Sequence, residues 1–160
     1  MQEQSKYLRI YLQDHLAGAT GGLELARRAR GSHEGEPAGE ELARIADEIE
    51  EDRERLLEIM RFCEVSEDRM KNAGAWAGEK LGRLKLNGET TSRSPLSSVV
   101  ELEGLYLGIT GKLSLWRNLE RAAGEHFASF DLPNLIARAE DQRSRVEELR
   151  LEAAAAALTI

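Results

Sequence analysis

Two residues with metal-ligand or acid–base chemistry, His15 and Asp52, interrupt apolar stripes in the sequence. The stripes belong to residues 5–30 and 37–63, and their spacing places both side chains on the inward faces of two helices. If these helices pair in antiparallel fashion about a turn near Glu34, His15 lies level with Asp52. An imidazole beside a carboxylate can bind a metal ion or share a hydrogen bond.

Gln142 falls at the same level in the last predicted helix. Leu105, in the helix predicted over residues 96–126, lies level with Gln142, and Glu103 precedes Leu105 by two residues. One interpretation is a structural layer of hydrogen bonds, which needs no cofactor; we favour it because a buried carboxylate requires partners. A second is a metal or small-ligand site built on His15 and Asp52. Gln142 and Glu103 are its further candidate ligands, for a single Fe, Mn or Zn ion. A third is that these groups face solvent.

No recognised catalytic motif accompanies these residues. The sequence lacks a P-loop, the G-x-S-x-G and H-E-x-x-H patterns, a Cys–His signature and a dinucleotide-binding fingerprint. The single cysteine, Cys63, ends an apolar stripe and is typical of a small core residue rather than a nucleophile. We therefore expect no catalytic residues, and an enzyme is the less favoured class.

The composition indicates one all-α domain over residues 1–160. Hydrophobic residues make up 41% of the chain, which is enough for a core. Charged residues make up 32%, which is too many for a membrane protein. The three prolines are too few for an all-β chain with many turns. An isoelectric point near 5.1 argues against nucleic acid as a partner. No apolar run reaches the roughly 20 residues of a membrane span, and MQEQSKYLRI is unlike a signal peptide, so a cytoplasmic location is expected.

Apolar residues at steps of three and four predict four long amphipathic helices and one weaker helix. The long helices cover residues 5–30, 37–63, 96–126 and 132–157, and the weaker one covers 67–85. Asp131 is the expected N-cap of the last helix, with Pro133 just inside it. Because each helix must bury its stripe against the others, the sequence favours a four-helix bundle.

The sequence also matches itself at an offset of 90 residues. Residues 18–27 and 108–117 share six of ten amino acids, and residues 50–58 and 140–148 share four of nine. Two matches in register indicate duplication of a helical hairpin. The predicted division is repeat 1 over about 5–63, a crossover over 64–94, and repeat 2 over about 95–157. Such a crossover makes the second and third long helices parallel.

Two related hairpins joined by a long crossover resemble the ferritin-like superfamily over nearly the whole chain. In di-iron members, the resemblance implies a Glu on each of two helices and Glu-x-x-His on each of the other two. The corresponding places here hold His15, Leu105, Ile49-x-x-Asp52 and Ala139-x-x-Gln142. A shift by one residue places Arg53 and Arg143 where imidazole is needed, and a guanidinium cannot bind a metal. The di-iron motifs are not retained, so no di-iron centre is expected.

Glycines recur in the first and third long helices, at Gly18, Gly21, Gly22, Gly104, Gly108 and Gly111. Each costs about 1 kcal/mol relative to alanine in a helix interior, so a compensating role is expected. Close packing of the two hairpins across their pseudo-two-fold axis is the favoured explanation. A pocket for a flat or apolar ligand is the alternative.

Charge is distributed unevenly along the chain. Residues 34–58 carry a net charge of −8, whereas residues 71–93, which include Trp76, carry +3. An acidic helix is usually a solvated face with arginine neighbours. The basic segment is expected to dock on the acidic helix of its own chain or, as the alternative, on that of a second chain in a homodimer.

Together these features predict a non-catalytic, ferritin-like helical bundle that acts as a binding or assembly module, with a protein partner that the sequence does not identify. The alternative is a metal-binding protein or metalloenzyme with a reduced mid-bundle site at His15 and Asp52.

Overall fold

The computed structural model describes residues 2–67 and 94–158 of the chain. Within these ranges the elements are all helical. They are α1 (Gln2–Ser32), α2 (Pro37–Phe62), α4 (Pro95–Ala123), the short 3-10 helix η2 (Ala128–Phe130) and α5 (Leu132–Ala157). The four long helices predicted from the sequence are thus confirmed. The weaker helix predicted over residues 67–85, and the basic segment with Trp76, fall outside the described residues apart from Glu67.

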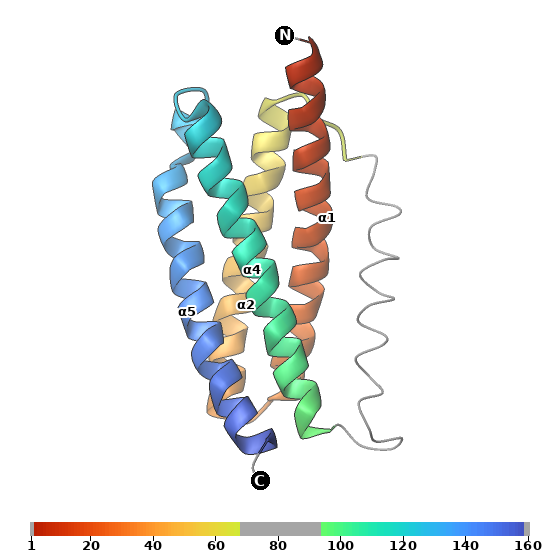
Figure 1. Cartoon of the computed structure of the whole chain (residues 1–160), viewed down its shortest axis with the longest axis vertical. Helices are drawn as coiled ribbons and strands as arrows, with labels where there is room; N and C mark the ends of the chain where they lie inside the picture. Colours follow the sequence, from red (N-terminus) through yellow and green to blue (C-terminus); the bar gives the residue numbers. More distant parts are fainter. Residues whose placement is uncertain (1, 68–93, 159–160) are drawn as a thin grey trace.

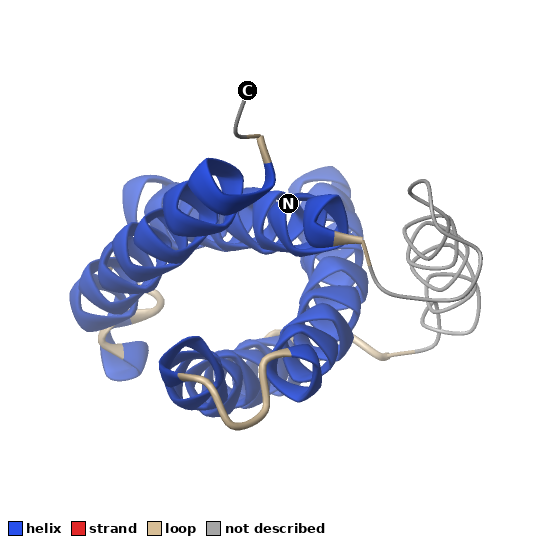
Figure 2. Cartoon of the chain, turned by 90° about the horizontal axis from the view of Figure 1, so that it is seen from below, coloured by secondary structure: helices blue, strands red, loops and turns tan. Residues whose placement is uncertain are grey.

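The four long helices form a bundle in which α1 pairs with α2 and α4 pairs with α5 (Figure 1). α2 and α4 run in the same direction, and α1 and α5 run opposite to them. α1 also packs along α4, whereas the contact between α2 and α5 is sparser. Seen end-on, the helices surround a common interior (Figure 2). At the seam between α2 and α5, the two helices must therefore be connected by long side chains and not by close packing of their backbones.

Both ends of α2 follow from local sequence. Pro37 starts the helix with a preset φ, after Gly35, whose φ of 85° suits glycine. The helix ends at Phe62, and the chain turns away at Glu64, whose φ is 54°. The Val65 N–H then donates to the Met60 carbonyl at 2.8 Å, which closes the last turn.

The second hairpin differs from its predicted boundaries. Ser94 caps α4 by accepting from the Leu96 N–H at 3.2 Å, but α4 ends at Ala123 rather than near residue 126. Asp131 does occupy the N-cap position of α5. However, it lies in the left-handed region with a φ of 46°, and its side chain makes no capping hydrogen bond. The short helix η2 fills the turn between the two long helices.

The core consists of two apolar clusters separated by a polar level. One cluster lies toward the start of α1 and includes Leu12, Leu16, Leu56, Leu113, Trp116 and Phe127. The other lies toward the end of α1 and includes Leu25, Ala26, Ile45, Leu102, Leu105 and Val146. Between them, buried or partly buried positions of α2, α4 and α5 carry Asp52, Lys112 and Gln142. The middle of the bundle is therefore where its chemistry gathers.

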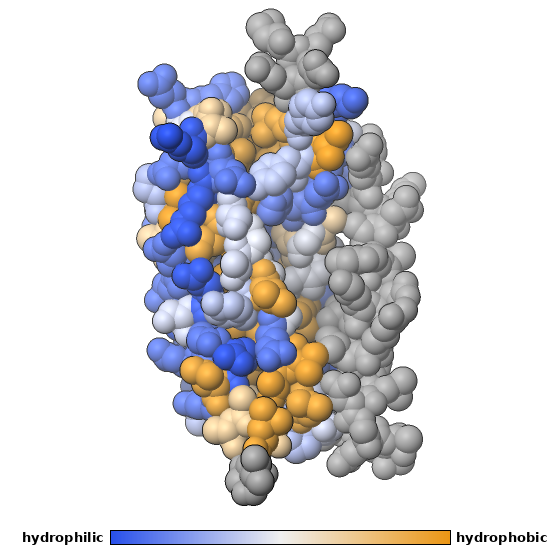
Figure 3. All heavy atoms as spheres, viewed as in Figure 1, coloured by the Kyte–Doolittle hydropathy of each residue, from blue (hydrophilic) through white to orange (hydrophobic). Residues whose placement is uncertain are grey.

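Part of the apolar surface remains exposed at one end of the bundle. Figure 3 shows hydrophobic side chains gathered at the lower end, where α4 begins and α5 ends. Leu96, Leu151 and Leu158 are the large exposed apolar residues of these two segments. Among the described residues, no helix combines the length and the apolar character that crossing a membrane requires.

Replacing Gly108 by alanine is expected to raise the free energy of unfolding by about 1 kcal/mol in urea denaturation. A Cβ at this position would meet nothing within 4 Å, so only the helix propensity changes. Gly39→Ala is the matched control, because its Cβ would lie 2.1 Å from the His33 carbonyl oxygen. That variant should lose about 1–3 kcal/mol. A loss in Gly108→Ala would contradict the open space assigned to Gly108.

Candidate functional site

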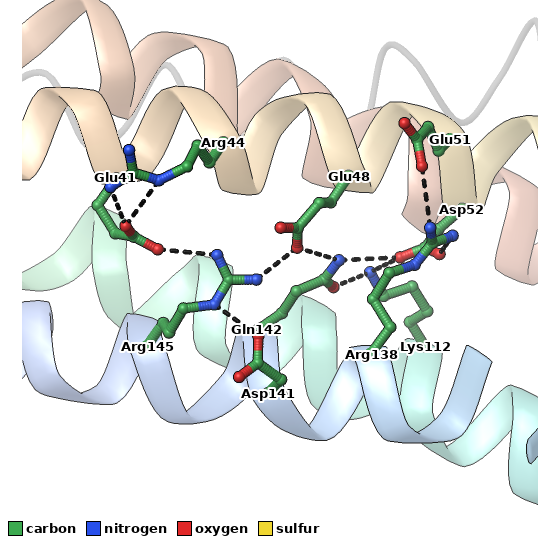
Figure 4. Close-up of polar contacts among 10 residues, drawn as sticks. All are labelled: Glu41, Arg44, Glu48, Glu51, Asp52, Lys112, Arg138, Asp141, Gln142 and Arg145. Atoms are coloured by element: carbon green, nitrogen blue, oxygen red, sulfur yellow. Dashed lines mark hydrogen bonds and ion pairs between the residues drawn. The ribbon is translucent and has the colours of Figure 1, made fainter. Parts of the chain in front are cut away.

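Asp52 of α2 is the shared partner of several side chains in a polar layer between α2, α4 and α5, and it lies at one end of the contacts drawn in Figure 4. It is only 1% exposed, yet it has three partners. Lys112 Nζ of α4 donates to Asp52 Oδ2 at 2.5 Å, and Gln142 Nε2 of α5 donates to the same oxygen at 3.2 Å. The guanidinium of Arg138, also on α5, donates to Asp52 Oδ1. One carboxylate therefore joins three helices, and its cationic partners offset the cost of burying its charge.

Gln142 connects the two halves of this layer. It is fully buried, and its Oε1 accepts a hydrogen bond from Lys112 Nζ. Its Nε2 donates to Glu48 Oε2 at 3.0 Å as well as to Asp52. Because the oxygen accepts from an ammonium and the nitrogen donates to carboxylates, the orientation of the amide is determined.

A ladder of ion pairs extends the layer along the seam between α2 and α5. Arg145 of α5 donates to Glu48 at 2.5 Å and to Glu41 at 2.8 Å. The hydrogen bond from Arg145, followed by that from Arg44, lowers the pKa of Glu41. Arg138 also donates to Glu51 at 2.9 Å. Charged side chains thus hold together the two helices whose contact is sparse.

The inward placement predicted for Asp52 and Gln142 is confirmed by their burial. His15 is half-buried, and its ring lies edge-on to Tyr11 with centroids 4.5 Å apart. Asp52 is bound by Lys112, Arg138 and Gln142, where a contact with His15 was expected. Glu103 lies outside the layer, because its side chain is 51% exposed and 3.7 Å from Arg150.

The sequence interpretation missed Lys112 and Arg138, although a signal for both was present. Lys112 stands three residues after Ile109 and four before Trp116, at the spacing of the buried stripe of α4. Arg138 stands four residues before Gln142 on α5. A long basic side chain at such a position can bury its stem and deliver its charge to an inward carboxylate.

The residues described by the structure contain no group of three or more His, Cys, Asp or Glu side chains that could hold a metal ion. Asp52 and Gln142 supply oxygen atoms of the kind that bind cations. Both oxygens accept hydrogen bonds from the Lys112 ammonium. The positive charge that these two oxygens bind is therefore the ammonium of Lys112, which belongs to the chain itself.

A cleft of about 900 Å³ lies beside the polar layer, between α1, α2 and α4. Its larger apolar side chains are Ile49, Leu56, Leu105, Ile109, Leu115 and Trp116. Its polar side chains include Gln13, Asp14, His15, Asp52, Arg53 and Lys112. Gly18 of α1 and Gly108 of α4 line the cleft and are exposed, so it is open to solvent between these two helices.

Glycines form much of the wall that α1 and α4 contribute. Gly18, Gly22, Gly108 and Gly111 line the cleft, and a Cβ built on any of them would meet nothing within 4 Å. Close packing of the helix backbones was the favoured explanation for these glycines, and for these four it is wrong. Gly104 differs from them, because Leu25 Cδ2 lies 3.0 Å from its Cβ position. The structure agrees with the alternative, a pocket.

Burial shifts the pKa of two side chains on the cleft wall. It lowers the pKa of Lys112, and the nearby carboxylate of Asp52 opposes this effect. Burial also lowers the pKa of His15, and the charge of Asp14 opposes that shift. At neutral pH His15 is therefore a neutral imidazole, with one nitrogen that donates and one that accepts.

Replacing Asp52 by asparagine is expected to lower the free energy of unfolding by about 3–5 kcal/mol, because it leaves two poorly solvated cations without their shared counter-ion. Urea denaturation at neutral pH measures the change. Glu51→Gln is the matched control, since Glu51 pairs with the same Arg138 but is 67% exposed. Its loss should stay below about 1 kcal/mol. Equal, small losses in both variants would show that Asp52 is not the centre of the layer.

The lowered pKa of His15 predicts a pH dependence of stability. Below the ordinary value of 6.5, the unfolded chain binds a proton at His15 more readily than the folded chain does. The contribution of His15 therefore makes the free energy of unfolding rise with pH up to about 6.5 and level off above it. His15→Asn should have a shallower slope than wild type in urea denaturation between pH 5 and pH 7. Parallel curves would contradict the assignment.

Comparison with known proteins adds no family to this description. The chain matches no protein-family model, and neither the curated proteins nor the solved structures compared with it give a match. What the chain binds must therefore be argued from the chemistry of the cleft.

Proposed function

We propose that this chain is a non-catalytic binding module that takes a small, largely apolar molecule into the cleft between α1 and α4. The observation that carries the proposal is the cleft itself, with its volume of about 900 Å³ and its wall of glycines whose Cβ positions face open space. Pockets for small ligands are mostly apolar, carry a few polar groups and range from about 300 to 1,000 Å³. The cleft meets each of these criteria.

The glycines support a pocket over a simple packing defect. Alanine would fit sterically at Gly18, Gly22, Gly108 and Gly111, and each change would favour the helix by about 1 kcal/mol. Larger apolar residues at the same positions would reduce the unfilled space, which itself lowers stability. The sequence thus forgoes stability at four positions that share one cleft. A ligand that fills the space accounts for all four.

The proposed architecture is ferritin-like without a di-iron centre. Its support is the pairing of α1 with α2 and of α4 with α5, the parallel course of α2 and α4, and the internal match at an offset of 90 residues. Leu105, Ile49 and Ala139, which stand where the resemblance would place metal ligands, are buried apolar residues. A binding role in the interior suits such a core better than metal chemistry does.

The proposal is tested with N-phenyl-1-naphthylamine, a neutral apolar dye whose fluorescence rises in apolar surroundings. We expect the intact chain to bind one dye molecule per chain. Gly18→Leu and Gly108→Leu place side chains in the cleft and should each weaken binding by about tenfold or more, which corresponds to about 1.4 kcal/mol. Fluorescence titration measures the affinity, and urea denaturation verifies that both variants are folded.

Gly31→Leu is the matched control for Gly18→Leu. Gly31 belongs to the same helix and has nothing within 4 Å of its Cβ position, but it does not line the cleft. This variant should bind the dye as wild type does. Equal weakening in all three variants, or no binding by wild type, would contradict the proposal.

Two alternatives from the sequence are tested on the same preparation. Elemental analysis of protein purified without chelator reports on a metal site at His15 and Asp52. Light scattering with and without dye reports on a homodimer. About one equivalent of metal that His15→Ala removes would favour the metal-binding alternative over an apolar ligand.

A further inference from the structure

The wall of the cleft contains a buried donor without an acceptor. Trp116 of α4 is 1% exposed, and its Nε1 has no hydrogen-bond partner within the described part of the chain. An indole nitrogen can only donate, and most buried donors in proteins are paired. Trp116 also belongs to the residues that line the cleft. A molecule in the cleft that carries an acceptor oxygen would supply the missing partner.

Lys112 offers a second donor one helical turn before Trp116. Residues four apart in a helix lie on the same face, so both side chains belong to the same wall of α4. The ammonium of Lys112 carries three N–H groups, and two of them are directed to Asp52 and Gln142. The third has no acceptor among the described residues. The indole N–H of Trp116 and the third N–H of Lys112 are therefore two donors without an acceptor on one wall of the cleft.

The charges around Lys112 favour an anion over a cation. Asp52 is shared between two cations, Lys112 and Arg138, so its single negative charge balances only one of them. Glu48, the next carboxylate along the layer, is itself paired with Arg145. Arg138 also pairs with Glu51, but Glu51 is largely exposed, and solvent weakens its effect. The other basic residue on the wall, Arg53, is bonded to Thr20 and Glu54. A second positive charge beside Lys112 would be repelled.

We propose that the ligand is an apolar carboxylic acid, whose carboxylate accepts hydrogen bonds from Lys112 Nζ and Trp116 Nε1. Its apolar part would lie against Leu105, Ile109 and the glycines of α1 and α4. This inference rests on the proposed function, because it names the chemical class of the molecule that enters the cleft. It also gives a role to donors that have no partner among the described residues.

The test compares three probes with the same ten-carbon chain, by isothermal titration calorimetry of the intact chain at neutral pH. The probes are decanoate, decan-1-ol and decyltrimethylammonium, each below its micelle-forming concentration. A hydrogen bond to a charged group predicts that decanoate binds at least about tenfold more tightly than decan-1-ol. The cationic probe should bind most weakly. Equal affinities for the acid and the alcohol would overturn the inference but not the apolar cleft, whereas no binding of either would also overturn the proposed function.

Three variants locate the carboxylate. Lys112→Met keeps the length of the side chain and should remove most of the preference for the acid over the alcohol. Trp116→Phe removes the indole donor and should reduce that preference about threefold or more. Lys6→Met is the matched control, because Lys6 is an exposed lysine of α1 outside the cleft, and it should leave the preference unchanged. If Lys112→Met does not fold, the double variant Asp52→Asn/Lys112→Met removes both buried charges and serves in its place. A preference that survives in the lysine variant and in Trp116→Phe would overturn the proposal.

Discussion

The buried charge of Asp52 is the constraint on which the arrangement of the bundle depends. A carboxylate that is 1% exposed must be surrounded by donors, and here they come from α4 and α5 while the carboxylate belongs to α2. Lys112, Arg138 and Gln142 can reach it together only in one rotational setting of these three helices. Replacing buried ion pairs by apolar residues of similar volume often costs no stability, so the role that we infer for this layer is to select one setting. The polar layer therefore acts on register, and most clearly along the α2–α5 seam, where contact is otherwise sparse.

The same layer explains why the cleft lies in the middle of the bundle. Charged and amide side chains at this level prevent one continuous apolar core, and two clusters form instead. On α1 and α4 the residues facing this level include glycines, which contribute no side-chain volume. The result is a space with an apolar wall on one side and the Asp52–Lys112 pair on another. Such a combination suits a molecule that is mostly apolar and has one polar end.

Much of this architecture could be predicted from residue spacing, because burial repeats with the period of a helix. The stripes on α2 and α5 predicted the burial of Ile49, Asp52 and Gln142. Spacing alone could not assign partners to Asp52, since long basic side chains reach inward from positions that also suit a solvated face. The glycines were ambiguous for a related reason. A residue without a side chain marks either a close neighbour or an empty space, and only the positions of α1 and α4 distinguish them.

The ammonium of Lys112 gives the layer a property that a bound metal would not. Di-iron proteins of the ferritin-like superfamily, whose architecture we propose for this chain, bind metal ions with mid-bundle carboxylates. Here the balancing charge is attached to α4, so the layer is complete whenever the chain is folded. An ammonium cannot change oxidation state, but it has directional donors, and two of its three N–H groups already hold the layer together. The remaining donor belongs to a residue on the cleft wall. In our proposal, the ammonium that allows the core to contain a carboxylate also binds the carboxylate of the ligand.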